Sequence, residues 1–229
     1  MGSTAEQIMA RLTEVYPGAR DATRAGPMAA YMRDRYPFLG LPATDRAVLD
    51  RAVLAGLPRP TEAELHAVAD ACWALPEREY QYFACALLRR HARACTPASL
   101  PVARRLIITK PWWDTVDTLA SHLVGPLVAG FPALVATMDA WAGEEDLWLV
   151  RTALLHQLRY GAATDAQRLF RYCTAQAGHP DFFVRKAIGW ALREYAKTDA
   201  AAVRAYVHAA GDRLSPLSAR EALRAAGRH

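Results

Sequence analysis

Residues 150–159, VRTALLHQLR, and residues 184–193, VRKAIGWALR, are two copies of one pattern set 34 positions apart. Both copies begin with Val and Arg, continue with Ala and an aliphatic residue, and end with Leu and Arg. A weaker copy, QYFACALLRR, begins at Gln81. A period of about 34 to 45 residues in an all-helical chain is typical of a HEAT-type solenoid, which presents one concave surface. The repeat therefore predicts an all-α, HEAT-like solenoid.

The rest of the chain is also typical of helices of ordinary length. Prolines and glycines interrupt it at short intervals, and the apolar–polar alternation of strands is absent. Two segments open with a capping-box pattern, Thr61 with Glu64 and Ser218 with Glu221. No linker or low-complexity stretch divides the sequence. We therefore expect about a dozen helices in a single domain covering residues 1–229.

Positive charge is unevenly placed along this 229-residue chain, whose formal net charge is +5. No acidic residue occurs between Glu79 and Asp114, and this interval contains Arg89, Arg90, Arg93, Arg104, Arg105 and Lys110. The planar guanidinium of arginine suits phosphate, so the distribution favours a polyanionic partner and a basic groove on the solenoid. A GC-rich genome, which raises Arg and Ala together, explains the composition equally well.

Composition argues against membrane, secreted and metal-binding proteins. No run of about 18 apolar residues occurs, and the first residues form an amphipathic helix pattern without the apolar core of a signal peptide. The histidines are scattered singly, and no CxxC pair is formed by the four cysteines, Cys72, Cys85, Cys95 and Cys173. We therefore expect a cytoplasmic monomer with reduced thiols in or near its core and with neither a metal nor a cofactor.

The segment PWWDTVDTLASHLV, residues 111–124, crowds two tryptophans and two aspartates into a helix that we expect to begin near Pro111. Asp114 falls near the helix N-terminus, where the macrodipole favours a carboxylate. Trp113 and Asp117 lie four residues apart on the flank of the apolar stripe. Helical phase therefore leaves Trp113 and Asp117 without a structural role. The stripe itself, which we expect in the core, consists of Trp112, Val116, Leu119 and Leu123.

A second informative helix is predicted in DFFVRKAIGWALREYAK, residues 181–197. Its apolar stripe consists of Val184, Ile188, Ala191 and Tyr195. The opposite face carries Lys186, Trp190, Arg193 and Lys197. An indole within a cationic stripe suits a nucleic-acid surface. Alternatively, the indole packs against the next repeat and the cations are merely solvated.

Four segments taken together, ITKPWWDTVD, LPEREYQ, VRKAIGWALREYAKT and LSPLSARE, closely resemble the AlkD family of bacterial DNA alkylation-repair glycosylases. MAAYMRDRYPFLGL resembles the opening segment of that family, so the resemblance spans nearly the whole chain in order. It implies a nucleoid-associated base excision repair enzyme that wraps duplex DNA. The implied reaction hydrolyses the N-glycosidic bond of N3- and N7-alkylated purines, such as 3-methyladenine and 7-methylguanine. Base flipping, which is general among glycosylases, is not expected.

The same resemblance implies which residues form the site. Trp113 and Asp117, the second Trp and second Asp of the WWDxVD motif, act at the lesion together with Trp190 of the IGW segment. Arg151 lies near the DNA backbone at the lesion. Pro111 departs from the small polar residue of the family, which should affect only the helix start. Further expected contacts with DNA are Tyr31, Lys186, Arg193 and Lys197.

Two residues have interpretations that stay open. Tyr31 matches a family tyrosine that faces DNA, and it suits a core-edge aromatic equally well. His156 takes the position of Trp190 in the repeat, four residues after Thr152, and serves equally well as a polar groove residue or an ordinary one.

The chemistry of a cationic leaving group agrees with a single carboxylate. An alkylated purine already carries positive charge and leaves as a neutral base, so the acid of ordinary glycosidases is not needed. Asp117 can stabilise an oxocarbenium-like sugar and position water, while Trp113 and Trp190 add cation–π stabilisation. No lysine lies beside the motif in an apolar setting as an imine-forming nucleophile. The residues therefore favour a monofunctional hydrolase over a lyase.

Two other functions stay open. A catalytically silent HEAT-like module would bind branched or damaged DNA, yet a carboxylate such as Asp117 facing phosphates would cost it affinity. A protein-interaction scaffold would present an apolar groove rather than the stripe of Lys186, Arg193 and Lys197. No residue decides between small methyl lesions and bulky minor-groove adducts.

Overall fold

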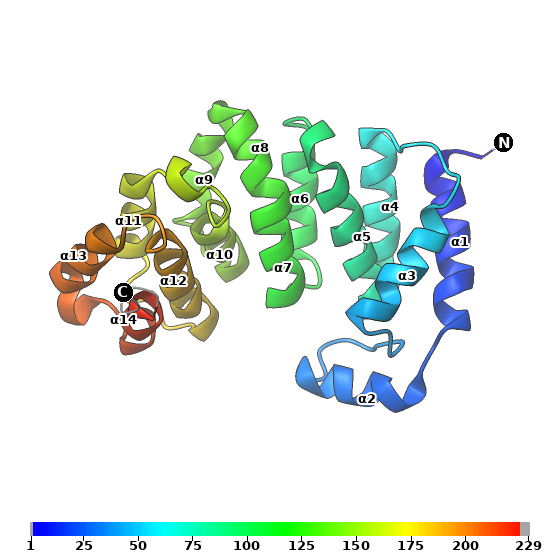
Figure 1. The fold of residues 1–229 in the computed structure, drawn as a ribbon, viewed down its shortest axis with the longest axis horizontal. Helices are drawn as coiled ribbons and strands as arrows, with labels where there is room; N and C mark the ends of the chain where they lie inside the picture. The colour runs from blue at the N-terminus through cyan, green and yellow to red at the C-terminus, as the bar shows by residue number, and fades with distance from the viewer. Residues whose placement is uncertain (1, 225–229) are drawn as a thin grey trace. The chain divides into compact units, whose positions relative to one another are not determined.

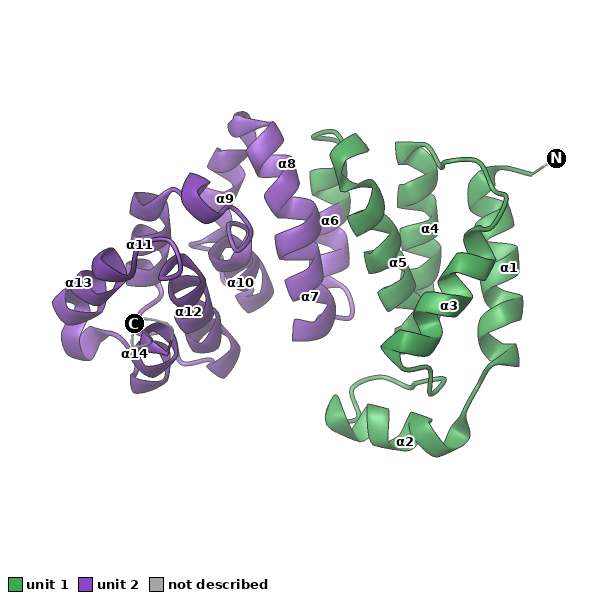
Figure 2. Ribbon diagram, in the orientation of Figure 1, with its two compact units in different colours: residues 1–102 green, residues 103–229 purple. Residues whose placement is uncertain are grey.

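The computed structural model describes residues 2–224, and every regular element within them is helical (Figure 1). The predicted all-α class is confirmed. The chain divides into two compact units, Met1–Val102 (unit 1) and Ala103–His229 (unit 2) (Figure 2). The single domain expected over residues 1–229 stays a prediction. No single helix of the described residues is long and apolar enough to cross a membrane, although one bent pair, Trp113–Gly130 with Pro132–Trp141, passes by length and composition.

The elements of unit 1 are α1 (Thr4–Gly18), α2 (Ala22–Tyr31), α3 (Ala43–Leu54), α4 (Glu62–Ala74), α5 (Arg78–His91) and the short 3₁₀ helix Ala92–Ala94. α1 packs on α3 and α4, and α4 packs on α5. A buried carboxylate, Glu79 of α5, fixes the connection between α2 and α3, because it accepts backbone N–H bonds from Leu39, Gly40 and Leu41 at 2.9, 2.9 and 3.1 Å.

Unit 2 contains the repeat that was visible in the sequence, as α10 (Leu147–Leu155) and α12 (Phe182–Tyr195), which pack against each other. α6 (Ser99–Ile108) begins in unit 1 and ends in unit 2. The α-helices that follow it are α7 (Trp113–Leu119), α8 (Gly125–Gly130), α9 (Val135–Trp141), α10 (Leu147–Leu155), α11 (Ala166–Ala175), α12 (Phe182–Tyr195), α13 (Ala200–Ala210) and α14 (Pro216–Leu223). The 3₁₀ helices are Pro132–Leu134, Gly161–Ala163 and Gly211–Arg213.

Helix starts in unit 2 are set by local capping. Four successive helices, α10 to α13, each begin after an aspartate whose side chain accepts a backbone N–H bond of the first turn; these are Asp146, Asp165, Asp181 and Asp199. Such N-caps satisfy amide groups that the helix itself leaves unpaired. Aspartate is therefore the N-cap of all four helices, α10 to α13.

The predicted capping box of Thr61 and Glu64 is confirmed at the start of α4. The capping box predicted for Ser218 and Glu221 is wrong. α14 begins one turn earlier, with Ser215 as its N-cap, because Pro216 suits the first helical position and Ser215 accepts the N–H bond of Ser218. Glu221 is thereby released for contacts with α12.

The predicted apolar stripe of the tryptophan-rich segment is confirmed. The side chains of Trp112, Val116, Leu119 and Leu123 are all buried. Trp112 also packs in an aromatic cluster with Trp148 and Phe183, whose ring centroids lie 5.8 and 4.8 Å from its own. The four cysteines are buried as free thiols, as expected.

α7 continues without a break through a π-helical segment, Ala120–Val124, into α8. Gly125 at this junction lies against the end of α10. A Cβ added there would come within 2.3 Å of the carbonyl oxygen of His156, and the carbonyl of Gly125 accepts a hydrogen bond from the Tyr160 hydroxyl at 2.7 Å. Close contact between α7–α8 and α10 therefore requires glycine at this position.

We expect Gly125→Ala to lower the free energy of unfolding by about 2 kcal/mol or more, because the new methyl group would overlap backbone that cannot rotate away. Gly130→Ala is the matched control, since Gly130 ends the same helix and an added Cβ there meets nothing within 4 Å. Urea unfolding of both variants measures the difference. Equal stability of the two variants would contradict the proposed contact.

Candidate functional site

α7 carries the two residues of the WWDTVD motif that helical phase singled out. The helix begins at Trp113, with Trp112 as its N-cap residue, two positions later than Pro111. Asp114 lies in the first turn, as predicted, and its Oδ1 accepts the N–H bond of Thr115 at 2.8 Å. Trp113 and Asp117 are both half-buried on this helix.

A bidentate ion pair joins Asp117 to Arg151 of α10. The guanidinium donates from Nε to Oδ1 at 2.7 Å and from a terminal nitrogen to Oδ2 at 2.8 Å. Only 14% of the Asp117 side chain is exposed. The expectation that Asp117 lacks a structural partner is therefore wrong, since the partner lies one repeat period further along the chain.

Arg151 lies inside unit 2 rather than on its surface. Its side chain is 4% exposed, and it also donates a hydrogen bond to the backbone carbonyl of Phe183 at 2.5 Å. One guanidinium therefore connects α7 and α10 with the first turn of α12. The predicted contact of Arg151 with the DNA backbone stays a prediction, and the observed partners give this residue a positioning role toward Asp117.

Burial and the ion pair act on the pKa of Asp117 in opposite directions. Desolvation raises the pKa of the carboxyl above its ordinary value, whereas the hydrogen bonds and positive charge of Arg151 lower it. Desolvation is the larger effect, so the pKa of Asp117 is raised. Arg151 thus limits how far the pKa of this carboxyl rises.

Asp117 and Trp190 line one open cavity of ≈ 260 Å³ within unit 2. Trp113 is not among the residues that line it. The sequence did not indicate the other lining residues, which are Thr118, Ser121, His122, Leu158, Arg159 and Glu194. Of these, Arg159 ends the first copy of the repeat, and Thr118, Ser121 and His122 lie within five residues of Asp117. Their closeness to Asp117 in the sequence could have indicated that these three residues line the same cavity.

The cavity wall on the α7 side includes part of the π-helical segment. Ser121 donates a hydrogen bond from its hydroxyl to the backbone carbonyl of Asp117 at 2.7 Å. His122 lies in the same segment, Ala120–Val124. Single π-helical turns within α-helices occur frequently at functional sites. This local geometry therefore agrees with a functional cavity at Asp117.

The cationic face of α12 is held in ion pairs. Glu221 of α14, whose side chain is 5% exposed, pairs with Lys186 at 2.8 Å and also with Arg193. Lys197 pairs with Glu194 at 2.7 Å. The alternative that these cations are merely solvated is therefore wrong. Their predicted contacts with DNA, and the basic groove as a whole, stay predictions.

Close packing of α14 on α12 brings Glu221 to these cations. A Cβ at Gly189 would lie 2.5 Å from the Cβ of Glu221 and 3.0 Å from the carbonyl oxygen of Ser218. Glycine next to Trp190 therefore permits the approach. The IGW segment therefore combines a close helix contact at Gly189 with a half-buried indole at Trp190.

His156 and Tyr31 lie in different environments. His156 is 1% exposed, its Nδ1 lies 2.7 Å from the carbonyl oxygen of Ala153, and burial lowers its pKa to about 4. The interpretation of His156 as a polar groove residue is wrong. Tyr31, at the end of α2 in unit 1, is 73% exposed, which contradicts the core-edge interpretation. Its predicted contact with DNA stays a prediction.

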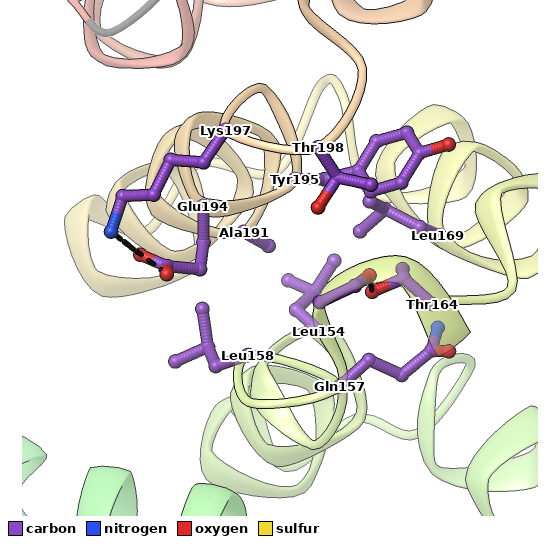
Figure 3. A pocket seen from close by; sticks show the side chains of 11 residues that line it. Leu154, Gln157, Leu158, Thr164, Leu169, Ala191, Glu194, Tyr195, Lys197 and Thr198 are labelled. Atoms are coloured by element: carbon purple, nitrogen blue, oxygen red, sulfur yellow. Dashed lines mark hydrogen bonds and ion pairs between the residues drawn. The ribbon is translucent and has the colours of Figure 1, made fainter.

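A smaller cavity of ≈ 90 Å³ lies beside the first and shares Leu158 and Glu194 with it. Figure 3 shows Leu154, Leu158 and Leu169 toward its interior and the pair of Glu194 and Lys197 at one side. Neither Asp117 nor Trp190 contributes to it. Because the predicted residues Asp117 and Trp190 line the ≈ 260 Å³ cavity, we assign the candidate site to that cavity.

Comparison with known proteins agrees with this geometry. A family model described as a DNA alkylation repair enzyme matches residues 12–225. A solved structure, described as a predicted DNA alkylation repair enzyme from Enterococcus faecalis, is 29% identical in sequence with a TM-score of 0.82, and the match covers 92% of this chain and 98% of the other. No curated protein matches. The resemblance found in the sequence is confirmed, and the chain belongs to the family of DNA alkylation repair enzymes.

Proposed function

We propose that this protein is a monofunctional DNA glycosylase that hydrolyses the N-glycosidic bond of cationic N3- and N7-alkylated purines in duplex DNA. Membership of the family gives a role in DNA repair with DNA as the substrate. The observation that carries the finer proposal is the Asp117 carboxylate, fixed by Arg151 and lining an open cavity together with Trp190.

A single carboxylate suffices for this reaction. The alkylated base already carries positive charge and leaves as a neutral purine, so no acid is required to protonate it. As the glycosidic bond breaks, the sugar becomes oxocarbenium-like, and Asp117 stabilises that charge and orients the attacking water. The bond to the base breaks with its electrons going to the base, and water supplies the new bond at the sugar carbon.

The indoles of Trp190 and Trp113 stabilise the same positive charge on the oxocarbenium-like sugar. Each can contribute about 1–2 kcal/mol of cation–π stabilisation when the cation is desolvated. The cavity lining contains no lysine, so no imine-forming nucleophile is provided at Asp117. Because the cavity is open rather than enclosed, the proposal does not require the base to be flipped into a pocket.

Arg151 serves the reaction as a positioning residue. A carboxylate that is largely buried loses hydration, and without a cationic partner it would take up a proton. The bidentate geometry also fixes the plane of the carboxylate. Asp117 therefore reaches the substrate ionised and oriented, at the cost of burying a second charge.

Asp117→Asn should lower release of 7-methylguanine and 3-methyladenine from methylated duplex DNA by about 10²–10³-fold, because it removes the charge that stabilises the transition state. Asp114→Asn is the matched control and should stay within about twofold, since Asp114 lies on the same helix and does not line the cavity. Chromatography of released bases against an enzyme-free blank measures both. Equal release by wild type and Asp117→Asn would remove Asp117 from this role.

Excision should fall as the pH drops through the raised pKa of Asp117, because the carboxylate is the active form. Arg151→Lys keeps a positive charge but loses the bidentate bonds, so the acid limb should move to higher pH, and Arg151→Gln should move it further. Single-turnover excision rates across mildly acidic to neutral pH measure the shift. Melting curves report folding, since Arg151→Gln leaves a buried carboxylate unpaired. An unmoved acid limb in a folded Arg151→Lys protein would contradict the positioning role.

Lys186→Gln and Arg193→Gln should each reduce the salt dependence of duplex binding, by at most about 0.9 in the slope of log affinity against log salt. Pairing with Glu221 makes the loss smaller than for a fully solvated cation. Arg220→Gln, at an exposed position of α14, is the control and should leave the slope unchanged. Fluorescence anisotropy over a salt series gives the values. A wild-type slope near zero would favour the protein-interaction scaffold instead.

A further inference from the structure

A second cavity is lined by residues of unit 1 alone, and none of the residues assigned to the reaction lines it. Its volume is ≈ 410 Å³, and it lies between the α3–α4 connection and the end of α5. Its lining residues include no acid and consist of Leu54, Leu57, Pro58, Arg59, Pro60, Arg90 and His91. Two of them, Arg90 and His91, belong to the acid-free interval that was conspicuous in the sequence.

Among residues 2–224, no acidic side chain pairs with the arginines of this cavity. Arg59 and Arg90 are exposed, and neither guanidinium makes a hydrogen bond or ion pair with any of residues 2–224. His91 is 9% exposed, and its buried Nδ1 has no hydrogen-bond partner. Burial first, and then the charges of Arg59 and Arg90, lower the pKa of His91. Two arginines without an acidic partner and a histidine therefore line the same cavity.

The helix macrodipole explains only part of this arrangement. Cations in the last turn of a helix are favoured by its negative end, which accounts for Arg90 and His91 at the end of α5. Arg59 comes from a different segment, and the dipole does not explain its presence. Prolines on both sides of Arg59 restrict its backbone, so the loop holds this side chain beside α5 with little loss of entropy on binding.

We propose that this cavity binds a phosphate group through Arg59, Arg90 and His91. Guanidinium groups bind phosphate oxygens in pairs of parallel hydrogen bonds, and a histidine ring N–H supplies a further donor. The cavity lies at the end of α5, whereas the α2–α3 connection meets the start of α5. There Arg78 donates its backbone N–H to the carbonyl oxygen of Pro37 at 2.9 Å. α5 has 14 residues, so the two ends lie about 20 Å apart.

Inorganic phosphate is the first probe. Calorimetric titration, with chloride at matched ionic strength as the reference, should show saturable binding to the wild-type protein. The Arg59→Gln/Arg90→Gln variant should bind at least about tenfold more weakly, because it loses charge-assisted hydrogen bonds. Arg89→Gln is the matched control, since Arg89 is exposed on the same turn of α5 and does not line the cavity.

The histidine supplies an independent readout. Phosphate should shift the ring resonances of His91 in an NMR titration and leave those of His66, a histidine of the same unit that bonds to Ser99, unchanged. Absence of saturable binding, or an equal loss in Arg89→Gln, would overturn the proposal. Neither outcome bears on Asp117, so this test succeeds or fails separately from the proposed excision reaction.

Competition identifies the source of the phosphate group. If undamaged duplex DNA displaces inorganic phosphate and the double variant has a smaller salt slope of duplex binding, the site holds the DNA backbone. If phosphate binds while duplex affinity and slope are the same in wild type and variant, the site holds a small phosphate compound. Both outcomes support the phosphate site and differ only in its occupant.

Discussion

The buried ion pair of Asp117 and Arg151 is the interaction on which unit 2 and its candidate site depend. Arg151 binds both carboxylate oxygens of α7 and the carbonyl of Phe183 in the first turn of α12. A single side chain of α10 therefore sets the positions of the two helices that carry Asp117 and Trp190. Burying two charges costs solvation free energy, and only the bidentate geometry and the third bond offset it.

A similar arrangement joins α14 to α12. Glu221 of α14 is buried and pairs with Lys186 and Arg193, and the absence of a side chain at Gly189 permits the approach. Arg151 fixes the carboxylate of Asp117, and Glu221 fixes the two cations that lie four residues before and three residues after Trp190 in α12. The ion pairs with Glu221 restrict the side chains of Lys186 and Arg193, which would lower the entropy lost in the DNA contacts proposed for them.

The contacts of Asp117 also bear on how one carboxylate could serve the proposed hydrolytic reaction. An acid in water would gain little from facing a cationic sugar, since solvent screens the interaction. Asp117 is largely withdrawn from water and yet lines an open cavity, so its charge acts through a medium of lower polarity. The ion pair with Arg151 keeps the buried carboxyl of Asp117 from taking up a proton. The same ion pair therefore holds the helices of unit 2 together and keeps Asp117 ionised for the proposed reaction.

The sequence alone determined the features that depend on local periodicity. Helical phase correctly placed Trp112 in the core and Asp114 in the first turn, the 34-residue repeat identified α10 and α12, and the motifs identified the family. Only the tertiary structure decided which groups meet. It paired Asp117 with Arg151, moved Glu221 from a predicted cap to an ion pair, and buried His156. Such contacts join residues about 30 positions apart and depend on how helices pack, which i,i+4 spacing does not encode.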